Sequence, residues 1–376
     1  MEMMTVKYRI TPLEPLISRD ARQFGAGSTM HSLKWLTNTV IAGAVRTTLW
    51  KTSSNPDSKE TLEALRRIPV KGSFPILNEK IYFPRPLDII KSTNDIYQIK
   101  PGNFPANSGA NMPLEGLMPS FPDAEEDFKP EKLNDFWDKD MMTYWLIHGK
   151  KGFMLENSCT LSAPAHDERV HASIDTSTGT SRDGMLFSTT GLDFIHKNGD
   201  DKTFESERFS QEEISIDIND MNLPAEFIAP LGGERRLAEF SRHEEDSALW
   251  ECPEEFPEII ESTLRLVLAS PAVFGNGWLP DWIDTDTLTG IIPNTDVNVK
   301  LVSAVTERWQ PVSGWSYERS TALRHKPMRR AVPAGSVYFF EIKNGTLEAK
   351  SIWLKSICLN EQDINDGFGL VLAGKW

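Results

Sequence analysis

The chain ends in Gly367-Phe-Gly-Leu-Val-Leu-Ala-Gly-Lys-Trp376, a glycine-bearing turn followed by a short apolar run. Glycine has no Cβ, so its backbone adopts positive φ and lets a ligand approach closely. Successive N–H groups of such a turn can bind an anion. Only seven residues follow Gly369, which leaves no room for the helix that dinucleotide-binding and P-loop motifs require. We therefore expect a fold that ends in a strand. The glycine turn either binds phosphate or packs in the core.

The composition indicates an intracellular protein. The 376 residues suffice for two domains or for one elaborated core. Three cysteines without metal-ligand spacing favour a reducing compartment over a disulfide scaffold. The N-terminus has no signal-peptide pattern, and the longest apolar stretch, residues 264–274, is too short to span a bilayer and contains Arg265. We expect a cytoplasmic protein without a membrane segment.

The charge is unevenly distributed along the chain. A net charge of −14 argues against a nucleic-acid-binding surface that covers the whole protein, but screening limits the reach of each charge to about 8–10 Å. The acids are bunched in short segments such as residues 123–127 and 251–255. Residues 319–340, in contrast, contain five Lys or Arg residues, Arg329 and Arg330 among them, and no acid. This predicts a local cationic patch on an acidic protein, with a solvated loop as the alternative.

Hydrophobic periodicity predicts an α+β fold. Residues 6–11 have the pattern of a strand, and the apolar positions of residues 36–49 fall on one helical arc. A hairpin-like pattern occupies residues 73–83, and a second amphipathic helix is predicted from Pro130 to Gly149. This order of strand, helix, hairpin and helix is most of a ferredoxin-like unit.

The middle of the chain predicts a long β-hairpin. Its strands, residues 170–175 and 185–190, flank the polar tip at residues 176–182. Farther along, Ala269-Ser-Pro-Ala-Val273 repeats the strand-then-bend pattern of Leu13-Glu-Pro-Leu-Ile17. We infer two copies of one fold, separated near position 250 by an acidic stretch.

No reaction is dictated by the residues. His166 and His171 are five positions apart and point to different faces of a helix or strand, which argues against a shared zinc ion. The chain has no Gly-x-Ser-x-Gly elbow, Walker lysine or HExxH motif. His31 and His171 are the candidates for a general base in RNA cleavage, and an ordinary surface or hydrogen-bonded histidine is the alternative for each.

Several segments instead suit an anionic polymer. Gly232-Gly-Glu-Arg-Arg236 places two guanidiniums, which match phosphate bidentately, beside a flexible backbone. The predicted hairpin adds Arg169, His171 and Arg182. The aromatic residues near the basic stretch are Trp309, Trp315 and Tyr317. Such side chains stack on unpaired bases, although core packing is the alternative for each tryptophan.

Four signatures match one family in order along nearly the whole chain. They are Gly43-Ala-Val-Arg46, Phe83-Pro-Arg-Pro-Leu-Asp88, Leu231-Gly-Gly-Glu-Arg-Arg236 and Arg330-Ala-Val-Pro-Ala-Gly-Ser-Val-Tyr-Phe-Phe340. Together with the terminal glycine turn, they resemble the third subunit of the Cmr effector complex. That family belongs to the RAMP superfamily of type III-B CRISPR systems.

The resemblance implies two tandem ferredoxin-like (RRM-like) domains with loop and hairpin insertions, residues 1–250 and 258–376. No first helix of the second domain is evident between residues 279 and 297. The resemblance also implies a non-catalytic antiviral subunit without cofactor or metal. Such a subunit holds the 5′ tag of the crRNA, docks the large polymerase/cyclase-like subunit to the backbone RAMP subunits and meets target RNA only indirectly. The alternatives are a metal-independent endoribonuclease of the same superfamily, which trims CRISPR transcripts, and a pure protein–protein adaptor.

By position, the terminal glycine turn corresponds to the superfamily's glycine-rich loop at the RNA surface. The hairpin, with its Thr178-Gly-Thr180 tip, resembles the hairpin that meets RNA where tag becomes guide. The acidic exterior is then expected to face solvent and protein neighbours. The residues expected to bind RNA are Arg46, Arg169, His171, Thr178, Arg182, Gly232, Gly233, Arg235, Arg236, Arg329, Arg330, Gly367, Phe368, Gly369, Gly374 and Lys375.

Overall fold

The computed structural model has a mixed α and β fold, with 40% of residues in strands and 17% in helices. It describes residues 5–20, 30, 32–93, 95–124, 127–197, 209–219, 222–257, 259–314 and 326–376. Several residues singled out in the sequence lie outside the described residues, namely His31, Trp315, Tyr317 and residues 319–325. The described residues contain both helices and strands, as the predicted α+β class requires.

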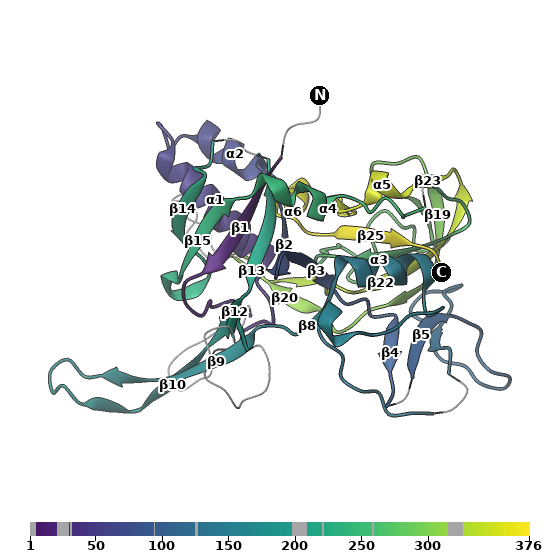
Figure 1. Ribbon diagram of the computed structural model, residues 1–376, viewed down its shortest axis with the longest axis horizontal. Helices are drawn as coiled ribbons and strands as arrows, with labels where there is room; N and C mark the ends of the chain where they lie inside the picture. The colour runs from purple at the N-terminus through teal and green to yellow at the C-terminus, as the bar shows by residue number, and fades with distance from the viewer. Residues whose placement is uncertain are drawn as a thin grey trace. The chain divides into compact units, whose positions relative to one another are not determined.

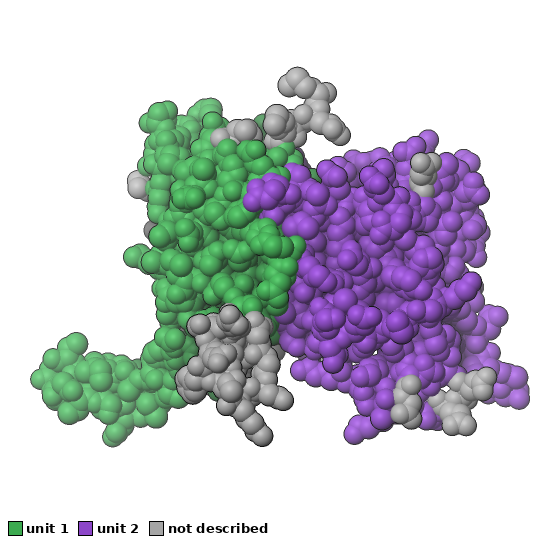
Figure 2. All heavy atoms as spheres, in the orientation of Figure 1, with its two compact units in different colours: residues 1–79, 163–244, 311–329 green, residues 80–162, 245–310, 330–376 purple. Residues whose placement is uncertain are grey.

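The chain forms two compact units, and neither is one continuous segment (Figure 2). Unit 1 comprises Met1–Glu79, Ala163–Glu244 and Pro311–Arg329. Unit 2 comprises Lys80–Ser162, Glu245–Gln310 and Arg330–Trp376. This division differs from the expected domains 1–250 and 258–376, because residues 80–162 pack with the C-terminal part of the chain. The acidic stretch near position 250 lies close to one junction, while the junctions after residues 79 and 162 carry no comparable composition signal.

Unit 1 is built on an antiparallel sheet in the order β14-β15-β1-β13-β2 (Figure 1). The strands are β1 (Val6–Pro12), β2 (Val70–Leu77), β13 (Glu213–Ile218), β14 (Glu226–Pro230) and β15 (Leu237–Arg242). Two helices, α1 (Asn38–Thr52) and α2 (Lys59–Arg67), connect β1 to β2. The short strands β11 (Ile195–Lys197) and β12 (Phe209–Gln211) pair with each other.

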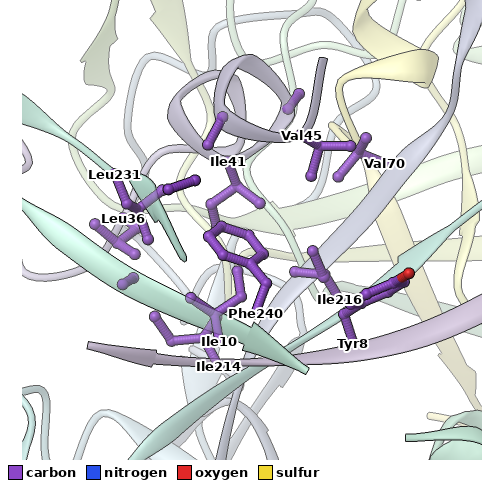
Figure 3. Close-up of a cluster of buried hydrophobic side chains, with 14 of the residues drawn as sticks. Tyr8, Ile10, Leu36, Ile41, Val45, Val70, Ile214, Ile216, Leu231 and Phe240 are labelled. Atoms are coloured by element: carbon purple, nitrogen blue, oxygen red, sulfur yellow. The ribbon is translucent and has the colours of Figure 1, made fainter. Parts of the chain in front are cut away.

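Helix α1 covers one face of this sheet because its apolar residues recur at helical spacing. Ile41, Val45 and Leu49 are buried, as the periodicity predicts. Figure 3 shows Ile41 beside Phe240 of β15, with Ile10 of β1 beneath them in the same core cluster. Burying each side chain of this size stabilises unit 1 by about 1.5–3 kcal/mol.

A two-stranded hairpin extends from unit 1 (Figure 1). Its strands are β9 (Ala165–Ile174) and β10 (Ser181–Asp193), which are longer than the sequence predicts. Phe187 pairs with His171 and Ser188 with Val170, so adjacent positions face opposite sides of the ribbon. The predicted hairpin is confirmed.

Unit 2 contains a second antiparallel sheet, in the order β18-β19-β22-β17-β25-β24. Its strands are β17 (Thr263–Leu268), β18 (Thr289–Ile291), β19 (Asn298–Val305), β22 (Val337–Asn344), β24 (Lys355–Ser356) and β25 (Leu370–Gly374). Residues 279–297, all of which are described, contain no helix, in agreement with the sequence. The remaining C-terminal elements are α4 (Ser247–Trp250), β16 (Ile259–Ile260), β20 (Gln310–Val312), β21 (Arg329–Ala331), β23 (Leu347–Glu348), α5 (Ala349–Ile352) and α6 (Glu361–Asn365).

The earlier segment of unit 2 corrects one predicted helix. Helix α3 is Lys139–His148 rather than residues 130–149, because Asp138 caps it by accepting a hydrogen bond from the Met141 N–H at 3.0 Å. The preceding residues form β7 (Phe136–Asp138), which pairs with β3 (Lys80–Pro84) and β8 (Thr160–Leu161). The intervening excursion forms a small sheet of β4 (Ile89–Lys91), β5 (Ile96–Pro101) and β6 (Ser120–Pro122).

Candidate nucleic-acid interface

The glycine turn of unit 1, Leu231–Arg236, is fixed against the bend that follows β1. The Gly233 N–H donates to the Ile17 carbonyl at 2.8 Å. Gly232 has a φ of 81°, and a Cβ there would lie 2.5 Å from the Ile17 carbonyl oxygen. Only glycine fits this combination of positive φ and close approach. The backbone of this turn, and with it the arginines that follow the glycines, is therefore held in a fixed position on unit 1.

The two arginines of this turn have different surroundings. Arg236 is mostly buried and pairs with Glu14 at 2.5 Å and Glu234 at 3.4 Å. The hydrogen bond from Arg236, followed by one from the Leu237 N–H, lowers the pKa of the Glu14 carboxyl. Arg235 is exposed and forms no ion pair with any described residue. Of the two predicted phosphate-binding guanidiniums, Arg235 is the one with its donors available.

The hairpin carries several predicted site residues on or near its polar side. Arg169 pairs with Asp167 at 2.7 Å, and Arg182 lies 3.6 Å from Asp175. The His171 ring stacks on Phe187 at 5.0 Å, and its Nε2 lies 2.8 Å from the Thr189 hydroxyl. The exposed tip includes Thr178, whose hydroxyl contacts that of Thr180 at 2.8 Å. Five acids outnumber the two arginines between residues 165 and 193, so the hairpin is acidic overall and its cationic groups are local.

The opposite side of the hairpin is aliphatic. Val170, Ile174 and Leu186 are 75%, 55% and 61% exposed. Sequence reasoning singled out only the polar residues, although alternation along β9 and β10 places these apolar side chains together on the other face.

The terminal glycine turn lies in the core of unit 2. Gly367, Gly369 and Gly374 are buried, and the Phe368 side chain is fully buried. The N–H groups of residues 367, 368 and 369 donate to the carbonyls of Ile364, Asp363 and Pro271, respectively. These three amides are therefore unavailable as an anion-binding nest, and core packing describes the turn. Among the residues of this segment predicted to contact RNA, only Lys375 is exposed.

The remaining predicted residues are spread over the chain. Arg46 is half-buried on α1 and donates to the Ile68 carbonyl at 2.9 Å, at the C-terminal end of α2. Arg329 is half-buried, whereas Arg330 is exposed with its guanidinium 4.9 Å from the centre of the Trp309 ring. Arg46 thus already has a structural contact within unit 1.

The two glycine turns occupy equivalent places in their units. In unit 1 the turn precedes β15 and bonds to the bend after β1, through Gly233 and Ile17. In unit 2 the turn precedes β25 and bonds to the bend after β17, through Gly369 and Pro271. The repeated strand-then-bend pattern in the sequence marks these two bends. The pairing of each bend with a glycine turn was not evident from the sequence, because the two partners are more than 90 positions apart in each unit.

Within the described residues, no cluster of three or more His, Cys, Asp or Glu side chains is arranged to hold a metal ion. The three cysteines are free thiols, and burial raises the pKa of Cys358 and of Cys252 to about 11. No helix among the described residues has the length and apolar character needed to cross a membrane.

Comparison with known proteins identifies one family. The model of the CRISPR-associated protein family Cas_Cmr3 matches residues 8–376. Among proteins of curated function, none matches the chain.

Several solved structures resemble the chain at low sequence identity. A chain of the type III-B Cmr-beta complex bound to cognate target RNA and AMPPnP, state 1, has a TM-score of 0.48 and 18% identity, covering 89% of this chain and 86% of that chain. A chain of Cmr-beta bound to cognate target RNA has a TM-score of 0.47 and 18% identity, covering 90% and 86%. A chain of the Csm3-Csm4 subcomplex of the type III-A interference complex has a TM-score of 0.33 and 12% identity, covering 91% and 94%.

Proposed function

The chain belongs to the Cas_Cmr3 family of CRISPR-associated proteins, and from this membership we propose that it is a non-catalytic, RNA-binding scaffold subunit of a type III-B effector complex. It holds the 5′ tag of the crRNA and docks the large polymerase/cyclase-like subunit to the backbone RAMP subunits in the cytoplasm. The family match along residues 8–376 is the observation that carries the proposal. It agrees with the resemblance seen in the four sequence signatures.

We further propose that both units are ferredoxin-like. The sheet order β15-β1-β13-β2 in unit 1 and the order β25-β17-β22-β19 in unit 2 both place the first strand between the last and the third. A ferredoxin-like unit has this order, because its third strand pairs with both the first and the second, and its fourth strand returns to pair with the first. Unit 1 has a helix, α1, between its first and second strands, whereas the described residues between β17 and β19 of unit 2 form no helix and the only helices among those between β22 and β25 are the short α5 and α6.

The contacts of unit 1 favour RNA binding at its turn and hairpin over binding on its sheet. An RRM stacks bases on aromatic side chains of its open sheet face. The corresponding positions of β1 and β13 instead hold ion pairs of buried cations, with Lys7 2.7 Å from Asp217 and Arg9 3.2 Å from the half-buried Glu213. Arg235 and the hairpin, which are exposed, are the better surfaces for a single strand.

Replacing Arg235 by alanine should weaken RNA binding by removing one phosphate contact. For single strands, the slope of log affinity against log salt should become shallower by about 0.7. The measurement is a salt titration of the full chain with a single-stranded oligoribonucleotide. Lys59→Ala is the matched control, because Lys59 is an exposed cation of α2, and it should leave the slope unchanged.

The same titration tests the scaffold proposal. An unchanged slope for Arg235→Ala would remove Arg235 from the RNA-binding surface. If ultraviolet cross-linking of the assembled complex also gives no adduct on the turn or the hairpin, the chain is a protein adaptor and the RNA-binding proposal fails.

The full chain should not cleave RNA. His171 is the described candidate for a general base, and its ring already contacts Thr189 and stacks on Phe187. Incubation with CRISPR repeat RNA in EDTA should leave the RNA intact. Cleavage that is abolished by His171→Ala would instead identify a metal-independent endoribonuclease.

A further inference from the structure

An exposed arginine stacks on a half-exposed tryptophan in unit 2. The Arg330 guanidinium carbon lies 4.9 Å from the centre of the Trp309 ring. Trp309 is 38% exposed, so a substantial part of the indole is accessible to solvent. Trp309 directly precedes β20, and Arg330 lies in β21. The contact holds a planar cation and a large π surface together.

The Arg330 guanidinium differs from other cations that lie over aromatic rings in this chain. Arg265 over Trp145 also pairs with Asp88. Arg242 over Tyr8 donates to the Leu223 carbonyl, and Lys150 over Tyr97 lies 3.8 Å from Asp123. Each of these cations therefore has an acceptor within the protein.

The Arg330 guanidinium, in contrast, forms neither an ion pair nor a side-chain hydrogen bond with any described residue. The acid closest to Trp309 in sequence, Glu307, lies near the Arg85 guanidinium. No acid occurs between Lys326 and Phe340. The N–H donors of Arg330 are thus available to an anion, while its guanidinium lies over the Trp309 ring.

We propose that Trp309 and Arg330 form a stacking site for one unpaired nucleotide of single-stranded RNA. The base stacks on the indole or on the guanidinium plane, and the N–H edge of Arg330 binds an adjacent phosphate. The site rests on the proposed RNA-binding function and adds a base-contacting position on unit 2. A nucleotide satisfies both groups at once, whereas a carboxylate from a protein partner satisfies only the guanidinium.

Binding of a 4-thiouridine-labelled oligouridylate to the full chain tests the site. Because stacking contributes about 1–3 kcal/mol per base, Trp309→Ala should weaken binding about fivefold or more without changing the salt slope. Arg330→Ala should make the slope shallower by about 0.7. Arg330→Lys keeps the charge but not the planar fork, so it should lower the affinity at an unchanged slope.

Phe121→Ala is the matched control, because Phe121 is an equally exposed aromatic residue of unit 2, at 38%. It should change neither affinity nor cross-linking. Trp309→Phe retains a stacking ring and should fall between the wild type and Trp309→Ala. Unfolding midpoints of all variants check that the loss is local. A duplex of the same length should bind without responding to Trp309→Ala, since its bases are not free to stack.

The possible outcomes separate this site from the general function. If the wild-type chain does not bind the oligonucleotide, the proposed RNA-binding function fails and the stacking site fails with it. If the wild type binds but Trp309→Ala and Arg330→Lys change the affinity less than twofold, only the stacking site is overturned. The same holds if these variants reduce only the retention of a protein partner in the complex.

Discussion

Replacing Asp88 by alanine should destabilise the protein by about 3–5 kcal/mol, because it leaves a fully buried guanidinium without its partner. Asp88 and Arg265 are both completely buried, and their oxygen and nitrogen lie 2.5 Å apart. The second Asp88 oxygen accepts a hydrogen bond from the Trp145 indole at 2.9 Å. The Trp145 carbonyl in turn accepts from Arg265. The substitution therefore disrupts a network that connects three separate segments of unit 2.

The measurement is equilibrium unfolding in urea, followed by tryptophan fluorescence. Lys343→Ala is the control, because Lys343 and Glu341 form an equally short but exposed pair, whose loss should cost at most about 1 kcal/mol. A double variant with Asp88→Leu and Arg265→Met should recover much of the stability, since neither charge is then buried alone. A loss below about 1 kcal/mol for Asp88→Ala would contradict this account of the network.

Gly369→Ala should also be strongly destabilising, by about 2–5 kcal/mol. Gly369 has a φ of 73°, and a Cβ there would lie 2.6 Å from the Cys358 sulfur. The left-handed conformation costs an L-residue about 1–2 kcal/mol, and overpacking a close-packed core adds about 1–3 kcal/mol.

Gly43→Ala provides the opposite control. Gly43 is exposed in the interior of α1, and a Cβ there meets no atom within 4 Å. Alanine should stabilise this helix by up to about 1 kcal/mol. Equal effects at the two glycines would show that close packing is not the reason for the glycine at position 369.

Local patterns predicted much of the secondary structure. The arc of Ile41, Val45 and Leu49 identified α1, and alternation with a polar tip identified the β9–β10 hairpin. Residues close in the sequence determine these elements, so hydrophobic periodicity alone is enough to predict them. The start of α3 was misplaced, because the strand pairing of β7 and the Asp138 cap outweighed the helical pattern of the preceding residues.

The candidate site was harder to predict, because exposure depends on distant partners. Arg235 and Arg236 are adjacent and chemically identical, yet Glu14 pairs with Arg236 and leaves Arg235 exposed. The terminal glycines suit a ligand loop and a packed turn equally well in the sequence. Their burial is decided by contacts with Cys358 and Leu146, at 2.6 Å and 2.8 Å from the missing Cβ atoms of Gly369 and Gly374.

Two of the sequence signatures meet in the fold for packing reasons. The Leu87 N–H donates to the Gly335 carbonyl at 2.8 Å. Gly335 has a φ of 85°, and a Cβ there would lie 2.4 Å from the Arg85 carbonyl oxygen. The Phe83–Asp88 and Arg330–Phe340 signatures are thus partners in the interior of unit 2. This contact explains the glycine at position 335 as a packing requirement.

The discontinuous order of the units has a consequence for the chain as it is synthesised. Asp88 is synthesised 177 residues before Arg265, so the nascent chain carries this carboxylate for nearly half of translation before its guanidinium partner exists. The closure of unit 2 must wait for the last strand, since β25 pairs with β17 beside Arg265. A nascent chain stalled before that strand would expose apolar edges to other chains, which makes late translation the period of greatest risk for aggregation.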